Sequence, residues 1–358
     1  MRPFFRRYDI AFYAPYPDEQ TIRDGYFQRV AAIDDVLCVK KRVYFSLLLR
    51  RGFVPIVKEV NGAVVVEANL FLYCLFFWLF TAFFCRVVYF HSVIEATKGL
   101  PLLYVKKFFL DLHGVVPEEM SYVGNNGLAT IFGHVERVAV ARAYCLISVT
   151  RSLLDHIDAK YQIGSAARKH LVLPIFPTEA ANPISNNACD RKGFIYAGGT
   201  QPWQNVGKML EFSEKHSEFS GIMLVGSIDR FNDSYRDSFD RVKDKWHLNS
   251  VSPDQVASYY QKAQFGFLVR SDSIVNRVAC PTKLVEYLKF GVVPVLDSSD
   301  LGDFKSLGMR YLSIGDFDFD FAAKLYSDYA SQNYDLYQNL IKNAEESMIV
   351  LVSLVECK

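Results

Sequence analysis

The sequence lacks several patterns that would assign it to a common class of protein. Its seven cysteines are odd in number and widely spread, and no two form a C-x-x-C pair. This excludes a disulfide framework and a cysteine zinc site. Basic and acidic side chains nearly balance, 40 against 39, so charge does not predict nucleic-acid binding. The N-terminus has no long apolar run after its charges, so we expect no signal peptide. These features predict a cytoplasmic protein with reduced thiols.

Motifs of other enzyme classes are also missing. There is no G-x-G-x-x-G, no G-x-x-x-x-G-K-[ST] and no G-x-S-x-G, so dinucleotide-dependent oxidoreductases, P-loop enzymes and α/β-hydrolases lack support. Asp316, Asp318 and Asp320 have the D-x-D spacing of some metal sites, but we expect them to begin a surface helix. Six of the seven histidines show no metal-ligand spacing and no carboxylate cluster: His91, His134, His156, His170, His216 and His247. We therefore assign no metal.

What is present is an apolar, alternating chain. Hydrophobic residues make up 51% of the 358 residues and charged residues 22%, which excludes a disordered chain and allows two domains of ordinary size. Short apolar runs alternate with amphipathic segments, a pattern typical of parallel α/β sheets. Strands are predicted around 9–15, 64–68, 87–91, 108–114, 145–149 and 170–173, and then around 193–199, 222–226, 265–270 and 292–296.

The predicted helices fill the gaps between these strands. They cover about 25–37, 94–105, 125–144 and 151–160 in the first half, and 206–216, 254–262 and 282–291 in the second. A segment rich in proline and small polar residues follows Pro174 and reads as a linker. We predict a first Rossmann-like domain over 1–175 and a second over 190–339, with a helix near 340–358 packing back on the first. The fold class is α/β, with two doubly wound domains facing across a cleft.

Residues 70–85 form the longest apolar run, and they are too few for a membrane-spanning helix. Because strand-like segments precede and follow it, a helix between two parallel strands explains the run. The alternative is an aromatic face lying in a bilayer surface, with Lys40-Lys41-Arg42 and Arg50-Arg51 attracted to anionic lipid.

The segment from Cys280 to Gly291 carries the clearest chemistry. Pro281 suits a first helical turn, and the N–H groups of Thr282 and Lys283 would face an anion at the positive end of the helix dipole. Lys283 and Glu286 are three residues apart and share one face of the helix. Phosphate-binding amides, a lysine charge and a carboxylate for a sugar diol together suit a nucleotide-sugar.

These residues, with others in the same order along the chain, resemble the two-domain GT-B glycosyltransferases, and specifically the retaining group called family 4. The matching parts span nearly the whole chain: Gly25 with Arg29, 111–119, Glu136 followed by 147–150, 196–199, and Pro281-Thr282-Lys283-x-x-Glu286-Tyr287. The resemblance implies transfer of a sugar from a nucleotide diphosphate sugar to an acceptor. The second domain would bind the donor and the first the acceptor.

The resemblance also implies roles for single residues. Glu286 would bind the ribose hydroxyls, and the amides of Thr282 and Lys283 would bind the diphosphate. His113 would act near the transferred sugar, and Gly25 and Arg29 would lie on the acceptor side. Relatives need no metal or other cofactor, because positive side chains and helix termini stabilise the leaving group. They retain the anomeric configuration, and the departing phosphate helps to remove the acceptor proton.

Two positions depart from the family pattern. Many relatives have an arginine after the glycine loop and a lysine four residues later, whereas Gly199 here is followed by Thr200 and later Gln204. Arg270, Arg277 and Lys283 are the expected substitutes for the two missing charges, and Trp203 is expected to wall the donor site. The first glutamate of a common Glu-x7-Glu pair is replaced by Val278.

From this we expect a glycosyltransferase of surface polysaccharide biosynthesis, with His113, Arg270 and Lys283 as its catalytic residues. Its partners would be a nucleotide-sugar donor and a glycan or lipid-linked acceptor, with a peripheral membrane contact at the inner face as an open alternative and no nucleic acid. Two other functions stay open: a non-catalytic partner of an active transferase, and another GT-B enzyme such as a sugar-nucleotide epimerase or an inverting transferase.

Overall fold

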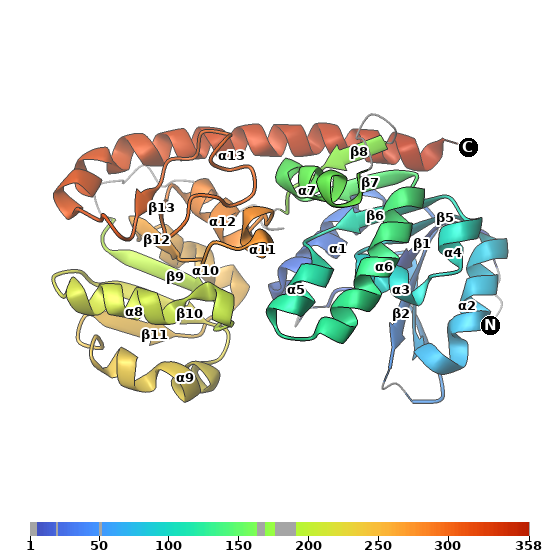
Figure 1. The fold of residues 1–358 in the computed structure, drawn as a ribbon, viewed down its shortest axis with the longest axis horizontal. Coiled ribbons are helices and arrows are strands. Elements are labelled where there is room, and N and C mark those ends of the chain that lie inside the picture. The colour runs from blue at the N-terminus through green and yellow to red at the C-terminus, as the bar shows by residue number, and fades with distance from the viewer. Residues whose placement is uncertain (1–5, 19–20, 50–51, 163–168, 176–190, 358) are drawn as a thin grey trace. The chain divides into compact units, whose positions relative to one another are not determined.

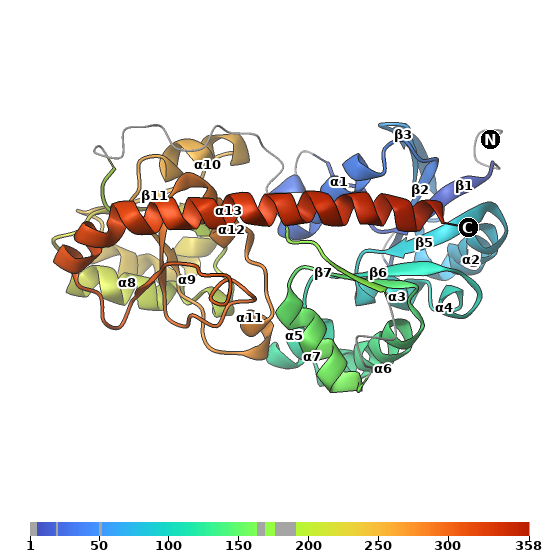
Figure 2. The same ribbon diagram turned by 90° about the horizontal axis from the view of Figure 1, so that it is seen from above.

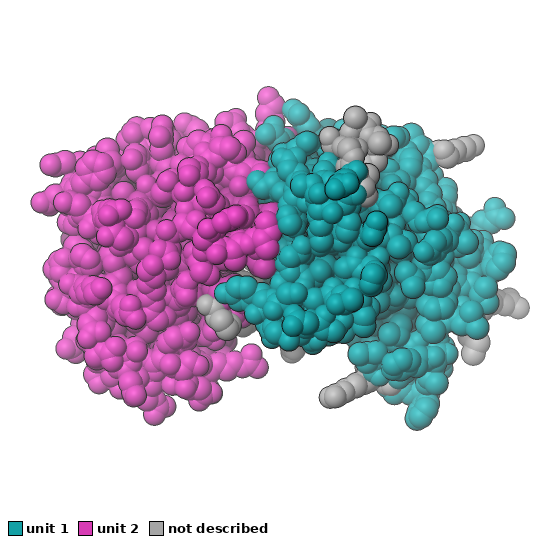
Figure 3. Space-filling model, in the orientation of Figure 1, with its two compact units in different colours: residues 1–178, 343–358 teal, residues 179–342 magenta. Residues whose placement is uncertain are grey.

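The computed structural model describes residues 6–18, 21–49, 52–162, 169–175 and 191–357. Two compact units divide the chain, and Figure 3 colours them separately. Unit 1 comprises Met1–Thr178 with Asn343–Lys358, and unit 2 comprises Glu179–Lys342.

Unit 1 is built on one eight-stranded sheet (Figure 1). Its strands are β1 (Tyr8–Tyr13), β2 (Arg42–Leu48), β3 (Ile56–Val60), β4 (Ala63–Asn69), β5 (Cys85–Phe90), β6 (Phe108–Leu112), β7 (Cys145–Ser148) and β8 (Lys169–Val172). They lie in the order β3-β4-β2-β1-β5-β6-β7-β8, and every neighbouring pair is parallel except β3 with β4. The segment 39–62, which shows no clear pattern in the sequence, supplies β2 and the antiparallel edge strand β3.

Helices cover both faces of this sheet, as Figure 2 shows from above. They are α1 (Gly25–Val36), α2 (Leu70–Phe84), α3 (Val93–Lys98), α4 (Leu102–Val105), α5 (Val116–Tyr122), α6 (Asn126–Arg142) and α7 (Arg151–Tyr161). The single helix predicted over 94–105 is wrong in one respect, because it is interrupted between α3 and α4. Gly99 ends α3 there, and a Cβ on it would lie 2.5 Å from the ring of Phe90, so only glycine fits.

Helix α2 accounts for the long apolar run. The side chain of Asn69 caps it by accepting from the amides of Phe71 and Leu72. It connects β4 to β5, two parallel strands of the same sheet, and buries Phe77 and Phe80 against that sheet, so the predicted helix between parallel strands is confirmed. Within the described ranges, no helix combines the length and apolar character needed to cross a membrane.

Unit 2 has a fully parallel six-stranded sheet. Its strands are β9 (Phe194–Gly198), β10 (Gly221–Val225), β11 (Trp246–Asn249), β12 (Phe265–Leu268), β13 (Val293–Leu296) and β14 (Leu312–Ser313). Its helices are η4 (Pro202–Gln204), α8 (Val206–Lys215), α9 (Ile228–Asp240), α10 (Pro253–Tyr260), α11 (Ile274–Arg277) and α12 (Thr282–Phe290). The sequence reading misses β11, β14 and α9, because the two strands are short and α9 has only one buried residue, Phe231.

The last helix, α13 (Phe319–Glu356), is a single helix of 38 residues. Its start is fixed by Asp318, whose Oδ1 accepts from the amide of Phe321. Ala322 and Tyr326 belong to the core of unit 2, while Leu351, Leu354 and Val355 belong to the core of unit 1. The expectation that Asp316, Asp318 and Asp320 begin a surface helix is confirmed, since all three are exposed at this helix start.

Both sheets share one topology. Numbered within its own unit, the parallel order β11-β10-β9-β12-β13-β14 is 3-2-1-4-5-6, and β4-β2-β1-β5-β6-β7 repeats it. This is the doubly wound Rossmann order, so the predicted α/β fold class is confirmed. The order of connection reverses between β1 and β5 and between β9 and β12. Ligands of such sheets bind beyond the carboxyl ends of the strands at these two points.

Candidate functional site

The glycine loop after β9 makes a close approach possible at the reversal point of unit 2. A Cβ on Gly198 would lie 2.3 Å from Oη of Tyr196 and 2.8 Å from Cε of Lys283. Gly198 therefore allows the stem of Lys283 to lie against the end of β9. The hydroxyl of Tyr196 donates to the carbonyl of Gly199 at 2.5 Å, which fixes the loop. Gly198 belongs to the glycine loop of the sequence motif, and the structure shows that its missing side chain is needed.

Arg270 lies just beyond the end of β12, beside this loop. Its Nη1 donates to Oδ1 of Asn276 at 3.3 Å, and its Nε is buried without a hydrogen-bond partner among the described residues. Among the described residues, no carboxylate forms an ion pair with Arg270. Burial lowers the pKa of Arg270 to about 10, which leaves the guanidinium charged at neutral pH. A half-buried cation with a buried Nε, whose hydrogen-bond partner is a neutral amide, can accept an anion.

The predicted helix start is confirmed as α12. Pro281 is its N-cap and has no side chain to accept from the first-turn amides. Leu284 and Leu288 are buried, and Gly291 ends the helix in the left-handed conformation with φ of 65°. Thr282 and Lys283 keep partial exposure, whereas Pro281 before them is buried, so the described residues cover the start of the helix only in part. This end of α12 can receive an anion.

Glu286 is held by a buried tyrosine. The hydroxyl of Tyr260 donates to Oε2 of Glu286 at 2.6 Å. Burial raises the pKa of Glu286, while the Tyr260 hydrogen bond and the nearby charge of Lys283 act in the opposite direction. The carboxyl group is thus fixed one turn into α12 and partly exposed. Nothing in the sequence pattern pointed to Tyr260, because it lies on α10.

The other residues predicted to bind the donor follow Gly199 in the sequence. Thr200 and Trp203 are half-buried, in the loop after Gly199 and in η4. Gln204 is only 6% exposed, and its Oε1 has no hydrogen-bond partner among the described residues. The two positions that lack the family's positive charges therefore carry polar side chains that can still hydrogen-bond.

Arg277 differs from Arg270. It is exposed, and its Nε and Nη2 each donate to Asp272 at 2.6 Å. Its charge is therefore already balanced by a carboxylate in solvent. Of the three predicted substitute cations, the structure brings Lys283 and Arg270 to the ends of β9 and β12 and pairs Arg277 elsewhere.

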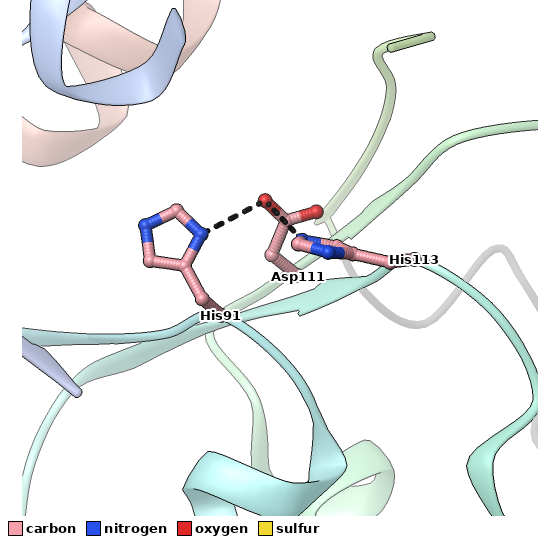
Figure 4. Close-up of side chains that lie close together, drawn as sticks. All are labelled: His91, Asp111 and His113. Atoms are coloured by element: carbon pink, nitrogen blue, oxygen red, sulfur yellow. Dashed lines mark ion pairs between the residues drawn. The ribbon is translucent and has the colours of Figure 1, made fainter. Parts of the chain in front are cut away.

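In unit 1 the side chains of His91, Asp111 and His113 meet at the carboxyl ends of β5 and β6 (Figure 4). His113 Nε2 lies 3.3 Å from Oδ2 of Asp111, and His91 Nδ1 lies 3.7 Å from the same oxygen. The expectation that the remaining histidines join no carboxylate cluster is wrong for His91. Parallel pairing of β5 with β6 brings His91 and His113 to the same sheet edge, although they are distant in sequence.

Asp111 is held on both oxygens. Arg29 donates from Nε to Oδ2 and from Nη2 to Oδ1, each at 2.9 Å, and Tyr89 donates its hydroxyl to Oδ2 at 2.8 Å. Burial alone would raise the pKa of Asp111, but Arg29 and then His113 hold it well below its usual range. Burial instead lowers the pKa of His91, so its ring stays neutral. The carboxylate thus anchors His113 at the sheet edge.

The predicted acceptor-side residues lie on α1, which begins beside this cluster. Gly25 is its first residue, and the ring of Tyr26 lies 5.3 Å from that of His113. Arg29 is 1% exposed and fully engaged, since its Nη1 also donates to the carbonyl of Leu173 at 2.5 Å. In the structure Arg29 therefore supports Asp111.

His91, Asp111 and His113 offer three atoms close enough to hold a metal ion. Asp111 already accepts from Arg29 and Tyr89, however, and a second cation would lie next to the guanidinium. The donor set fits a positioning network for His113 better than a metal site. That the protein needs no metal stays a prediction.

No protein-family model matches the sequence, and no curated protein matches it. Solved structures do match. A glycosyltransferase from Rickettsia africae ESF-5 has a TM-score of 0.64 at 10% identity, covering 98% of each chain. Sucrose-phosphate synthase from Thermosynechococcus elongatus has a TM-score of 0.61 at 12% identity, covering 97% of this chain and 96% of that one.

A lipopolysaccharide outer-core galactosyltransferase is similar at a TM-score of 0.58 and 13% identity, over 94% of this chain and 99% of that one. Identities this low show the fold alone. The chain therefore has the α/β fold of GT-B glycosyltransferase structures, with two parallel-sheet domains.

Proposed function

We propose that the protein transfers a sugar from a nucleotide diphosphate sugar to a glycan or lipid-linked acceptor. The observation that carries this proposal is the half-buried guanidinium of Arg270, whose Nε is buried and which has no carboxylate partner among the described residues; it follows β12, the strand next to β9. The uncapped start of α12 and the stem of Lys283 against Gly198 add two further anion-binding features on neighbouring elements. A diphosphate supplies the negative charge that all three would bind.

In this proposal unit 2 binds the donor. The amides that begin α12 hold the diphosphate, and Lys283 and Arg270 stabilise the charge that develops on the leaving group. Glu286, fixed by Tyr260, accepts hydrogen bonds from the ribose hydroxyls. Thr200, Trp203 and Gln204 line the donor site after the glycine loop.

Unit 1 supplies His113 and the acceptor side. Asp111 holds the His113 ring in place, so His113 can hydrogen-bond the transferred sugar or the acceptor hydroxyl. The reaction is retaining and metal-independent, and a donor phosphate oxygen removes the acceptor proton. The similarity to a lipopolysaccharide galactosyltransferase supports a surface glycan or a lipid-linked acceptor. Such an acceptor places the protein in the cytoplasm at the inner face of the membrane.

A second function stays open because Thr200, Gln204 and Val278 replace family residues. In that case the protein is a non-catalytic partner that keeps the fold without donor turnover. Thermal unfolding with a panel of nucleoside diphosphates separates the two. Stabilisation by UDP or GDP that disappears in Glu286→Ala and Lys283→Ala, but persists in the exposed control Arg277→Ala, supports the donor site. No response to any nucleotide favours the non-catalytic partner.

The reaction itself is tested by a panel of nucleotide sugars, with nucleotide release measured with and without acceptor. Release that depends on acceptor supports transfer. A nucleotide-sugar product with inverted sugar stereochemistry and no acceptor requirement indicates an epimerase. For a transfer product, NMR of the anomeric proton separates the retaining reaction from an inverting one.

A further inference from the structure

The outer face of α2 is apolar and uncovered in unit 1. Phe71 and Phe83 are each 76% exposed and Leu75 is 63% exposed, and Leu72, Phe76 and Leu79 on the same side are also exposed. Helix α2 contains no charged residue. Its inner side is occupied by Phe77, Phe80 and Thr81, which are buried against the sheet. Packing against the sheet therefore accounts for the apolar residues on the inner side of α2, but not for those on its outer side.

Apolar exposure continues past both ends of the helix. At its start the hydroxyl of Tyr73 donates to the carbonyl of Phe53 at 2.7 Å, and Phe53 and Val54 are about four-fifths exposed. At its end lies α4, which is beside α2 in Figures 1 and 2 and exposes Tyr104 and Val105. Together these residues form one apolar patch, which we call the α2 patch. Contiguous exposed patches of this kind mark binding surfaces.

The part of the sequence that contains the α2 patch is rich in basic residues. The sequence from Lys40 to Lys107 holds ten basic and three acidic residues, although the whole chain has a formal charge of +1. Two of the three acids are paired, Glu67 with Lys58 and Glu95 with Lys98. Two further bases pair with acids outside this range, Lys40 with Glu356 and the buried Arg42 with Asp34. The patch thus lies within a strongly basic part of a nearly neutral chain.

We infer that the α2 patch docks on the surface of a bilayer that contains anionic lipid. Phenylalanine, leucine and tyrosine side chains would enter the boundary between headgroups and acyl chains, and the basic residues around them would contact lipid phosphates. A second copy fits less well, because a symmetric dimer through this patch would bring two strongly basic segments together. The inference is independent of sugar transfer, since docking requires only unit 1.

Vesicle co-sedimentation tests it on the full chain. Vesicles of phosphatidylcholine alone are compared with vesicles in which about one-third of the lipid is phosphatidylglycerol. The wild type should bind the anionic vesicles, and binding should weaken as salt rises. Phe71→Gln/Leu75→Gln/Phe83→Gln should bind about tenfold more weakly or worse, since apolar insertion drives docking. The matched control Leu307→Gln/Phe321→Gln/Ile349→Gln removes three exposed apolar side chains elsewhere and should bind like the wild type.

Three results overturn the inference: no wild-type binding to anionic vesicles, equal binding by the two triple variants, or a wild-type dimer in sedimentation equilibrium that only the α2 variant dissociates. If the α2 triple variant unfolds at a lower temperature than the control, Phe71→Gln/Phe83→Gln replaces it. Stabilisation by nucleotides is measured on the same samples. If the protein fails to bind vesicles but is still stabilised by nucleotides, only the docking inference is overturned. If it binds vesicles but is not stabilised by nucleotides, only the donor site is overturned.

Discussion

Each sheet has an arginine near its reversal point, Arg29 buried and Arg270 half-buried, and the two have opposite surroundings. Arg29 in unit 1 meets both oxygens of Asp111 at 2.9 Å. Arg270 in unit 2 meets the neutral amide oxygen of Asn276, and no described carboxylate pairs with it. The first charge is balanced within the protein. The second charge has no charged partner among the described residues, and we propose that an anionic ligand supplies one.

This difference distinguishes an arginine that supports the fold from one that we propose binds a ligand. Removing a buried charge from water is unfavourable unless a partner compensates for it. Where the protein supplies that partner, as for Arg29, the pair specifies and supports the fold. Where it does not, as for Arg270, the proposed anionic ligand would compensate for the partial desolvation of the charge. Predictions that alter one charge in each unit can therefore test the comparison.

The largest effect is expected for Asp111→Ala. It leaves Arg29 buried and uncompensated, which should destabilise unit 1 by roughly 3–5 kcal/mol, measured as a lower urea midpoint. Because ionic partners hold the pKa of Asp111 below the 3.8 of an unperturbed carboxyl, the pair stabilises the fold above about pH 4. The loss of stability in Asp111→Ala relative to the wild type should become smaller only as the pH falls below that value.

Asp272→Ala is the matched control for Asp111→Ala. It also removes a carboxylate that accepts hydrogen bonds from two nitrogens of one arginine, Arg277, but this pair is exposed to solvent. The urea midpoint should change little, because solvent already screens this charge. Equal losses in the two variants would contradict the distinction between balanced buried charge and surface charge.

Next in size is the effect of His113→Ala. Nucleotide binding should be unchanged, because the donor features lie in unit 2, while the rate of transfer should fall about 100-fold or more. Initial rates of nucleotide release with acceptor measure this. His134→Ala, on the exposed side of α6, is the control. A near-wild-type rate in His113→Ala would show that the cluster in unit 1 is not part of the active site.

Arg270→Met should weaken binding of nucleoside diphosphates about 10- to 100-fold, the usual loss for a hydrogen bond to a charged group. Thermal stability without nucleotide should not fall, because the substitution removes a half-buried charge that has no carboxylate partner among the described residues. Titration calorimetry and thermal unfolding measure the two quantities. If Arg270→Met lowers the unfolding temperature while Arg277→Met weakens binding, the assignments of the two arginines are reversed.

The smallest effect is expected for Glu286→Gln. Burial raises the pKa of Glu286 above its ordinary 4.5, so ionisation opposes folding at neutral pH. The variant should unfold at a slightly higher temperature than the wild type at pH 7, and the two should converge below about pH 4.5. Nucleotide binding should decrease in the same variant. A stability difference of the opposite sign would mean that the charged carboxylate supports the fold without ligand.

Much of the fold followed from local sequence. Runs such as 108–110 and 265–268 are apolar and short, and parallel strands buried on both faces require this pattern. Pro281 and Gly291 fixed both ends of α12 by backbone conformation alone. Strand β11 and helix α9 escaped prediction because they bury few apolar side chains of their own.

The sequence by itself determined the α/β alternation, the start of α12 and the positions of its polar residues, because these depend on neighbours along the chain. Only the tertiary structure decided which charges meet. Pairing of β5 with β6 joined His91 to Asp111, and the packing of α1 brought Arg29 to the same carboxylate. Whether a buried charge is balanced depends on residues that are distant in sequence, and local patterns carry no record of them.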